Sequence, residues 1–568
     1  MKASIKTYVM IALCLALAAC QPGAMGESEL VQSLIESFNT LTPTPFQPIP
    51  PTQVHTWPAK TGLPLAGMED TATPAAQAAL PGVWLAEALP PALRQKVTLG
   101  AGLEPNASSQ DAMLHLEVSQ QYPAAWWVYA LVAPFPTIAD ETSTTELTRF
   151  WRGEGQGLMA GHPLYMSAET RAAFTALWGE PASGSVETRA DGQLLDTAWA
   201  NQPAWAIVPF EDLSPRWKVL RVDNQSPVEK DFDEGQYALR VPFGLREGNA
   251  AGLVDLPATN READKMTVVL MTGVTALVRA TGAKMEQLGM TYPGQDIRDW
   301  MVGADITHVS NEVSFDPRCP DANPYQDNLM FCSKPEYIQL LEDVGVDVVE
   351  MTGNHLMDWR YDAILNTFDM YQQQGMEYFG SGETLEAARQ PLLMEHNGNR
   401  LAFIGCNPAG PETDWATDTR AGTASCDYEW MKAEISRLRD EGYLPIVTLQ
   451  YFETYVFKPS EIQRRDYPPL AEAGAVIVSG SQAHFPQAMQ FDGDHFIHYG
   501  LGNLFFDQMD IPVVGTRREF LDRHVFYDGR YISTQLLTAM LEDYARPRPM
   551  TAEERTQMLQ DAFADSVW

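Results

Sequence analysis

The chain has 568 residues, and its 39 basic and 74 acidic side chains give a formal net charge of −35 at pH 7. A body this acidic repels nucleic acid and anionic lipid headgroups, so we exclude both as partners of the body as a whole. The length predicts two to four domains once an N-terminal leader is set aside.

That leader has the features of an export signal. Two lysines precede an apolar run of eleven residues, 9–19, which is too short to span a bilayer as a mature helix. Its end, Leu17-Ala18-Ala19-Cys20, resembles the bacterial lipobox, which implies cleavage before Cys20 and lipid modification of that cysteine. We therefore expect a lipoprotein signal peptide over residues 1–19, although an ordinary signal with a chance cysteine is the alternative.

Residues 20–79 are expected to form the lipidated cysteine and a proline-rich stalk. Seven prolines fall within residues 40–67, and proline fixes φ and resists helix formation, so this stretch predicts a semi-rigid extended spacer. The expected arrangement is a body on the extracytoplasmic face of the cell membrane. Acyl chains would tether it there, and the lipid anchor would be its link to the membrane.

Residues 80–255 are predicted to form a first, smaller α/β domain. "PAAWWVYALVAPFPT" indicates a buried strand, and "STTELTRFWRGEG" and "SAETRAAFTALWGEP" indicate helices with Ser or Thr at the start. "PAWAIVPFEDLSPRWKVLRVD" indicates strand, turn, strand. This order loosely resembles part of the periplasmic solute-binding fold; an α/β domain of no particular type is the alternative.

From residue 265 the pattern becomes a regular alternation of strands and helices. Apolar runs such as "MTVVLMTG", "VDVVEMTG", "LPIVTLQYF" and "AVIVSGSQAH" alternate with amphipathic stretches such as "YDAILNTFDMYQQQG" and "DYEWMKAEISRLRDEG". "PLLMEHNGNRLAFIGCN" predicts two strands around an Asn-Gly turn. This alternation predicts a layered α/β/α domain over residues 265–510. Residues 511–568 are expected to be a C-terminal extension that ends in an amphipathic helix.

Four cysteines remain beyond the leader, an even number in a chain predicted to be exported. We expect the pairs Cys319–Cys332 and Cys406–Cys426, since each pair brackets one loop rich in Pro, Gly, Asp or Asn. A zinc site is the alternative, but no C-x-x-C spacing supports it.

Polar residues follow several of the predicted strands, where α/β sheets bind ligands. They belong to a set of motifs that occurs in a fixed order: "HVSNEVSF", "GVDVVEMTGNHLMDW", "GMEYFGSGETLEAARQP", "GNRLAFIGCN", "PIVTLQYFETY", "GSQAHFPQAMQ" and "HYGLGNLFFDQ". Together these motifs, over about residues 266–508, resemble the CapA family, which is linked to poly-γ-glutamate capsule synthesis. The resemblance implies the fold of the calcineurin-like metallophosphoesterases.

The resemblance also implies a two-metal site, in which paired cations clamp an oxyanion and activate a bridging water. This chain keeps part of the implied ligand set: Glu312, Asn354, His355 and His484. Val274 stands at the family's aspartate position, and Gln450 and Ser481 stand at histidine positions. The remaining four residues predict a degenerate site that holds one divalent ion of the Mn or Zn class, or no ion at all.

Two functions of different class follow from this pattern. The resemblance implies an enzyme, or an enzyme-like factor, in the synthesis or handling of a surface polymer such as poly-γ-glutamate. The lost ligand positions favour a non-catalytic lipoprotein that binds an anionic surface polymer or a small ligand. Whether the chain is an enzyme is left open by its sequence, and no catalytic residue is assigned from it.

Overall fold

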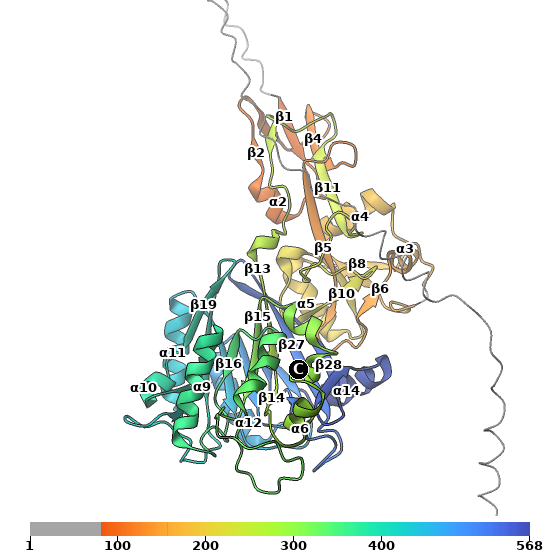
Figure 1. Ribbon diagram of the computed structural model, residues 1–568. Helices are drawn as coiled ribbons and strands as arrows, with labels where there is room; N and C mark the ends of the chain where they lie inside the picture. The colour runs from red at the N-terminus through yellow and green to blue at the C-terminus, as the bar shows by residue number, and fades with distance from the viewer. Residues whose placement is uncertain (1–80, 156) are drawn as a thin grey trace, which may run out of the picture. The chain divides into compact units, whose positions relative to one another are not determined.

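The computed structural model describes residues 81–155 and 157–568, and the described residues belong to one compact unit (Figure 1). The predicted leader, Cys20 and the proline-rich stalk lie outside them. Across this part of the chain, no helix has the length and the apolar character needed to cross a membrane. We call residues 81–262 the first lobe and residues 263–568 the second lobe.

The first lobe is built on a mixed sheet with the strand order β3-β1-β4-β11-β5-β9-β7-β8, and β10 pairs with β5 and β6. Its longer elements are β1 Gly82–Leu85, α2 Pro91–Lys96, β3 Glu104–Asn106, β4 Leu114–Val118, β5 Ala125–Pro134, α3 Thr144–Trp151, β7 Leu164–Met166, α4 Ala168–Trp178, β8 Val186–Thr188, α5 Asp191–Ala200, β9 Trp205–Pro209, β10 Trp217–Val222 and β11 Arg240–Leu245. The short strands are β2 Thr98–Leu99, β6 Glu141–Thr142 and β12 Val254–Asp255.

Local sequence explains the elements of this lobe that we predicted. Strand β5 lies at the centre of the sheet, and nine of its ten residues are buried, as its apolar run requires. The side chain of Ser143 caps α3, and that of Ser167 caps α4. Helix α4 ends at Gly179, which has φ +82°, a conformation that glycine adopts without steric cost. The predicted buried strand and both helices are confirmed.

The second lobe contains two large sheets, and β18 Ser381–Gly382 pairs with β21 Gly422–Thr423 in a small separate one. The first has the order β17-β16-β15-β13-β27-β28-β29, with β14 beside β15 and β26 beside β14, and the second has the order β19-β20-β22-β23-β25-β24. Their strands are β13 Met266–Thr272, β14 Val274–Thr275, β15 Ile306–Asn311, β16 Val348–Glu350, β17 Glu377–Phe379, β19 Leu392–His396, β20 Asn399–Cys406, β22 Leu444–Gln450, β23 Ile477–Ser481, β24 Met489–Asp492, β25 His495–His498, β26 Asn503–Phe505, β27 Arg518–Tyr527, β28 Arg530–Glu542 and β29 Arg546–Pro549.

The two sheets pack face to face, with helices on their outer faces. One buried cluster joins side chains of both sheets, among them Met271, Val348, Phe403 and Ile446. The helices of this lobe are α6 Arg279–Leu288, α7 Arg298–Val302, α8 Ile338–Asp343, α9 Tyr361–Gln374, α10 Leu385–Ala388, α11 Tyr428–Asp440, α12 Glu461–Asp466, α13 Pro468–Glu472 and α14 Ala552–Ala564. The α/β class is confirmed, but the layering is α/β/β/α where we expected one central sheet.

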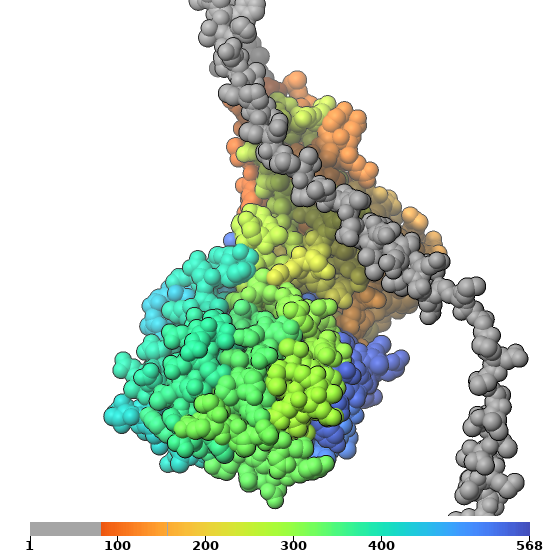
Figure 2. Space-filling view, in the orientation of Figure 1, coloured from red at the N-terminus to blue at the C-terminus, as the bar shows by residue number. Residues whose placement is uncertain are grey.

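The expected boundary at residue 510 does not separate two structural units. Strand β27 pairs antiparallel with the whole length of β13, from Met266 opposite Tyr527 to Thr272 opposite Leu521, and β28 continues the sheet. The sequence after residue 510 lacks the strand–helix alternation that we used to define the domain, so we expected an extension there. Figure 2 shows the dark blue C-terminal residues against the orange residues of the first lobe, where Arg555 pairs with Asp140.

Two further details concern the covalent and helical structure. Both predicted disulfides are confirmed: Cys319–Cys332 and Cys406–Cys426 are bonded, over sequence separations of 13 and 20 residues. The stretch after Ser460 forms two short helices, α12 and α13, rather than one. The break falls at Tyr467-Pro468, because Pro468 and Pro469 have no backbone N–H to continue the helical hydrogen bonds.

Candidate functional site

The ends of parallel strands position the candidate site. In the first sheet, Ser310 at the end of β15 lies opposite Glu350 at the end of β16, and β14 runs beside β15. In the second sheet, Gln450 at the end of β22 lies opposite Ser481 at the end of β23. Side-chain hydrogen bonds join the strand ends of the first sheet to those of the second.

The amide of Gln450 lies at the centre of this meeting point. Its Nε2 donates to the Oε1 of Glu312 at 2.6 Å and to the Oδ1 of Asn354 at 3.1 Å. The hydroxyl of Ser481 donates to the Oε1 of Gln450. We call these four residues the Gln450 centre. Gln450 is fully buried and Glu312 is 1% exposed, so the amide satisfies a buried carboxylate that would otherwise be costly.

A second carboxylate extends the Gln450 centre inwards. Glu350 is buried, accepts a hydrogen bond from the Thr352 hydroxyl at 2.5 Å, and lies 3.5 Å from the Ser481 hydroxyl. The other oxygen of Glu350 is 3.5 Å from the Nε2 of His308, which is itself buried. Sequence reasoning missed both residues. The signal was present, since each is a polar residue inside an apolar strand.

His355 lies at the rim of the centre and is oriented by an acid. Its Nδ1 is 2.7 Å from the Oδ2 of Asp358, and its Nε2 is 3.4 Å from the Nδ2 of Asn354. Burial lowers the pKa of His355, but the hydrogen bond and charge of Asp358, with the charge of Glu312, raise it above its usual value on balance. Asp358 therefore stabilises the protonated form of this ring more than water stabilises that of a free imidazole.

Asp414 is a further acid that the sequence did not reveal. It lies in the loop between Cys406 and Cys426, and its Oδ2 is buried with no partner among the described residues. Burial and the nearby charge of Asp358 raise the pKa of Asp414 to about 7. Its loop has no periodic pattern, so no local signal marked this aspartate.

His484, the fourth candidate ligand, has different partners. It has a left-handed backbone with φ +49°, its Nδ1 is 2.8 Å from the Oδ1 of Asn503, and its Nε2 is 4.0 Å from Glu453. Within the described residues, no hydrogen bond joins His484 to Glu312, Asn354 or His355. The structure thus connects three of the four candidates and leaves His484 in a neighbouring arrangement.

An apolar cluster stands where the family resemblance implies an aspartate. Val274 is fully buried and packs with Val313, Phe331 and Phe506, among others. The residue before it shows how tightly the chain is packed. A Cβ added to Gly273 would lie 2.0 Å from the carbonyl oxygen of Gly502. The backbones of Thr272-Gly273 and Leu501-Gly502 therefore touch, and only glycine leaves room for this contact at position 273.

The donors present do not fit the two-metal centre that the resemblance implies. In residues 81–155 and 157–568, no group of three or more His, Cys, Asp or Glu side chains lies where it could hold a metal ion. The amide of Gln450 already engages the oxygens of Glu312 and Asn354, and a neutral amide N–H cannot ligate a cation. The arrangement is a closed hydrogen-bond network rather than an open coordination sphere.

Comparisons with known proteins agree with the order of the motifs. Residues 268–508 match the family model described as "Bacterial capsule synthesis protein PGA_cap". The chain is 25% identical over 259 residues to "Capsule biosynthesis protein CapA" of Bacillus anthracis, covering 44% of this chain and 62% of that protein. It is 22% identical over 261 residues to "PGA biosynthesis protein CapA" of Bacillus subtilis (strain 168), covering 45% of this chain and 68% of that one. The match therefore spans less than two thirds of the B. anthracis protein.

Among solved structures, the chain is similar to the calcineurin-like phosphoesterase YfkN from Bacillus subtilis, with 14% identity, a TM-score of 0.29, and coverage of 52% of this chain and 97% of that one. It is also similar to an ABC-type phosphate transport receptor from Vibrio cholerae, with 13% identity, a TM-score of 0.22, and coverage of 28% of this chain and 76% of that one.

Proposed function

We propose that this chain is an accessory protein for a surface polymer such as poly-γ-glutamate. The reason is that residues 268–508 form a domain of the CapA family of capsule synthesis proteins. In this proposal it binds the polymer or a growing end of it and does not hydrolyse it with a pair of metal ions. The Gln450 centre is the single observation that carries the second half of the proposal.

The chemistry of the centre supports recognition rather than hydrolysis. A two-metal hydrolase needs several anionic or imidazole ligands around an open position for water. Here Val274 and Gln450 remove two of those ligands, and the Gln450 amide ties Glu312 to Asn354. What remains at the rim is a set of hydrogen-bonding groups, the amide of Asn354 and the imidazole of His355, that suits the amide and carboxylate groups of a γ-linked polyglutamate.

Charge gives this proposal a property that can be measured. The body has a net charge of −35 and the polymer is a polyanion, so long-range repulsion opposes their association. Salt screens repulsion between exposed charges beyond about 10 Å at 0.1 M. Binding of poly-γ-glutamate is therefore expected to strengthen when the ionic strength rises from about 0.01 to about 0.1 M, the opposite of a site built on positive charge.

The experiment is a metal and activity analysis of the purified chain. After incubation with Mn²⁺ or Zn²⁺ and dialysis, elemental analysis should find much less than one ion per chain, with no hydrolysis of a phosphodiester or of poly-γ-glutamate. Poly-γ-glutamate should still bind, and His355→Ala should weaken that binding. One or more retained ions per chain, with hydrolysis that His355→Ala abolishes, would overturn the proposal.

That second outcome defines the rival function, a hydrolase with one metal ion of the Mn or Zn class. It is favoured by the connection of Glu312, Asn354 and His355 within one network. The two functions differ in the role of the Gln450 amide, because a metal ion would have to displace it from both oxygens.

The proposal includes a place for the protein. The Leu17-Ala18-Ala19-Cys20 stretch supports a lipid anchor at Cys20 that would hold the body on the extracytoplasmic face of the membrane. Cys20→Ser should release the protein from the membrane fraction or leave the precursor uncut. If the variant were still labelled with lipid, the anchor assignment would be wrong.

A further inference from the structure

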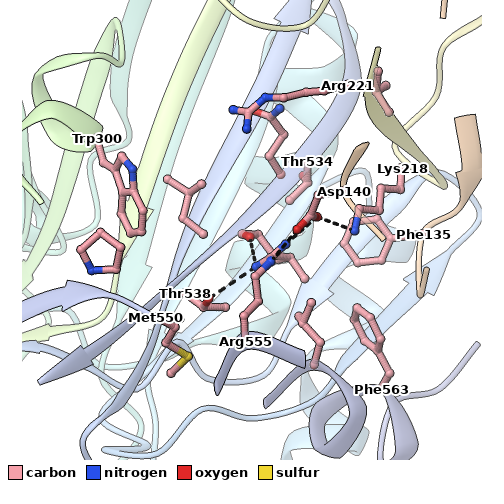
Figure 3. Close-up of a pocket in the computed structure, with 16 residues that line it drawn as sticks. Phe135, Asp140, Lys218, Arg221, Trp300, Thr534, Thr538, Met550, Arg555 and Phe563 are labelled. Atoms are coloured by element: carbon pink, nitrogen blue, oxygen red, sulfur yellow. Dashed lines mark hydrogen bonds and ion pairs between the residues drawn. The ribbon is translucent and has the colours of Figure 1, made fainter. Parts of the chain in front are cut away.

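A cavity of about 190 Å³ lies where strand β10 of the first lobe approaches strand β28 of the second (Figure 3). It lies outside the Gln450 centre and shares no residue with it. Its wall combines residues of β10, β28, β29, α14 and α7 with residues of the segment between β5 and β6. The cavity therefore depends on residues as far apart in the chain as Asp140 and Arg555, which are 415 positions apart, and no sequence pattern indicated it.

Most of the wall is apolar. Trp300, Met550 and Phe563 line the cavity together with Phe135, Leu536 and Leu559. Figure 3 shows Trp300 on one side of the cavity and Phe135 and Phe563 on the other. A wall of this kind favours a ligand with an apolar body, since small-molecule sites are mostly apolar with a few polar groups that fix orientation.

One ion network in the wall is already complete. Asp140 accepts from the Nε and Nη2 of Arg555, at 2.8 and 2.9 Å, and Lys218 lies 2.7 Å from it. Lys218 also donates to the carbonyl oxygens of Thr137 and Ile138, at 2.7 and 3.0 Å, so its three N–H groups are used. This network joins the two lobes, but its lysine has no donor left for a ligand.

Arg221 and Gln535, by contrast, keep unused groups at the cavity. The Nε and Nη2 of Arg221 donate to Glu229, while its Nη1 has no partner among the residues that the structure describes. Gln535 donates its Nε2 to the same Glu229 at 3.1 Å, and its Oε1 is buried with no partner in the described part of the chain. A buried polar atom without a partner is rare in proteins and points to a water or ligand that is not part of the chain.

The charge around the cavity is opposite to that of the whole chain. Three cations line it, Lys218, Arg221 and Arg555, against Asp140 in the wall and Glu229 behind it, so the local sum is +1. The chain as a whole carries −35. A local positive charge with a free guanidinium N–H favours an anion, and a planar guanidinium matches the two oxygens of a carboxylate.

We propose that this cavity binds a small organic carboxylate with an apolar chain. The carboxylate would accept from the Nη1 of Arg221, and the chain would lie against Trp300 and Met550. This site is separate from the polymer-binding surface proposed above, and its ligand would contact both lobes at once. Because β10 and β28 both contribute, binding should also oppose separation of the lobes.

The test uses the full-length chain, sodium hexanoate as probe, and isothermal titration calorimetry. Hexanamide is the matched neutral probe, with the same chain and no charge. Hexanoate is expected to bind one to one, at least ten-fold more tightly than hexanamide. Arg221→Gln should weaken hexanoate at least ten-fold and leave hexanamide unchanged. Arg437→Gln, on the exposed face of α11, is the control for the same loss of charge.

Arg221→Gln leaves the buried Glu229 without its cation and could unfold the protein. A second variant therefore tests the cavity without changing this ion pair. Met550→Trp leaves the Arg221–Glu229 pair in place and fills the cavity, and it should abolish hexanoate binding with the thermal midpoint of the free protein retained. Equal affinity for the two probes, no binding of hexanoate at 10 mM, or full binding to a folded Met550→Trp variant would each overturn the proposal. None of these outcomes bears on the metal and polymer experiment, so the two proposals fail separately.

Discussion

Replacement of Gln450 by methionine tests the Gln450 centre most directly. Methionine has nearly the same length and shape but no amide, so the change removes hydrogen bonds with little change in packing. Two donated bonds are lost, to Glu312 at 2.6 Å and to Asn354 at 3.1 Å, together with the one accepted from Ser481. The carboxylate of Glu312, 1% exposed, is left buried without this donor.

The cost follows from the kinds of bond. A hydrogen bond to a charged group is worth about 1.5–3 kcal/mol and one between neutral groups about 0.5–1.5 kcal/mol. Gln450→Met should therefore lower the free energy of unfolding by about 3–5 kcal/mol at pH 7. Urea titration followed by circular dichroism, in the presence of a chelator, measures this value.

Gln463→Met is the matched control. Gln463 is also fully buried, and its amide donates to Gln487 at 2.7 Å and to the carbonyl of Tyr499 at 3.0 Å, so all its partners are neutral. We expect it to cost about 1–2 kcal/mol less than Gln450→Met at pH 7. An equal cost for the two variants, or a wild type that itself loses stability in chelator, would refute the reasoning.

Three further predictions concern the same domain. Val274→Asp combined with Gln450→His and Ser481→His restores three ligand types of the family. Elemental analysis of this triple variant should find about one retained metal ion or more per chain. No gain of metal would contradict the placement of these strand ends. Cys319→Ser with Cys332→Ser should lower the free energy of unfolding by about 3 kcal/mol in urea titrations, since the bridge closes a loop of 13 residues. An unchanged urea midpoint would show that the bridge adds no stability. Burial lowers the pKa of His524 to about 4. As the pH falls below about 6.5, the usual pKa of histidine, this imidazole takes up a proton in the unfolded protein but stays neutral in the folded one. Stability is therefore expected to fall between about pH 6.5 and pH 4 by up to about 3 kcal/mol from this group, and His524→Gln should flatten that part of the profile; a profile that does not change would argue against it.

Much of the secondary structure and the disulfide pattern could be predicted because the signals are local. Strand β5 is a buried apolar run, Ser143 and Ser167 are helix caps, and the Asn397-Gly398 pair joins β19 to β20 in an antiparallel hairpin. The two loop-bracketing cysteine pairs also followed from spacing and parity. Each of these features depends on residues within about twenty positions of one another.

The substitutions at the candidate site were also visible in the sequence, but their effect was not. Val274, Gln450 and Ser481 could be recognised as departures from a ligand set by their order in the chain. That Gln450 bridges Glu312 and Asn354, 138 and 96 residues away, depends on how two sheets meet. Asp414 entered the site in the same way, from a loop with no pattern of its own.

By itself, the sequence indicated many of the strands and helices up to residue 510, favoured the cysteine pairing that forms, and showed which positions depart from the family's ligand set. It could not determine what lies against each strand, because a strand buried on both faces has the same apolar run whether helices or a second sheet cover it. Only the tertiary structure placed β27 beside β13, packed the two sheets together, and formed the cavity at Arg221. Local preferences act between near neighbours, whereas register, layering and cavities are set by contacts between side chains that the sequence keeps far apart.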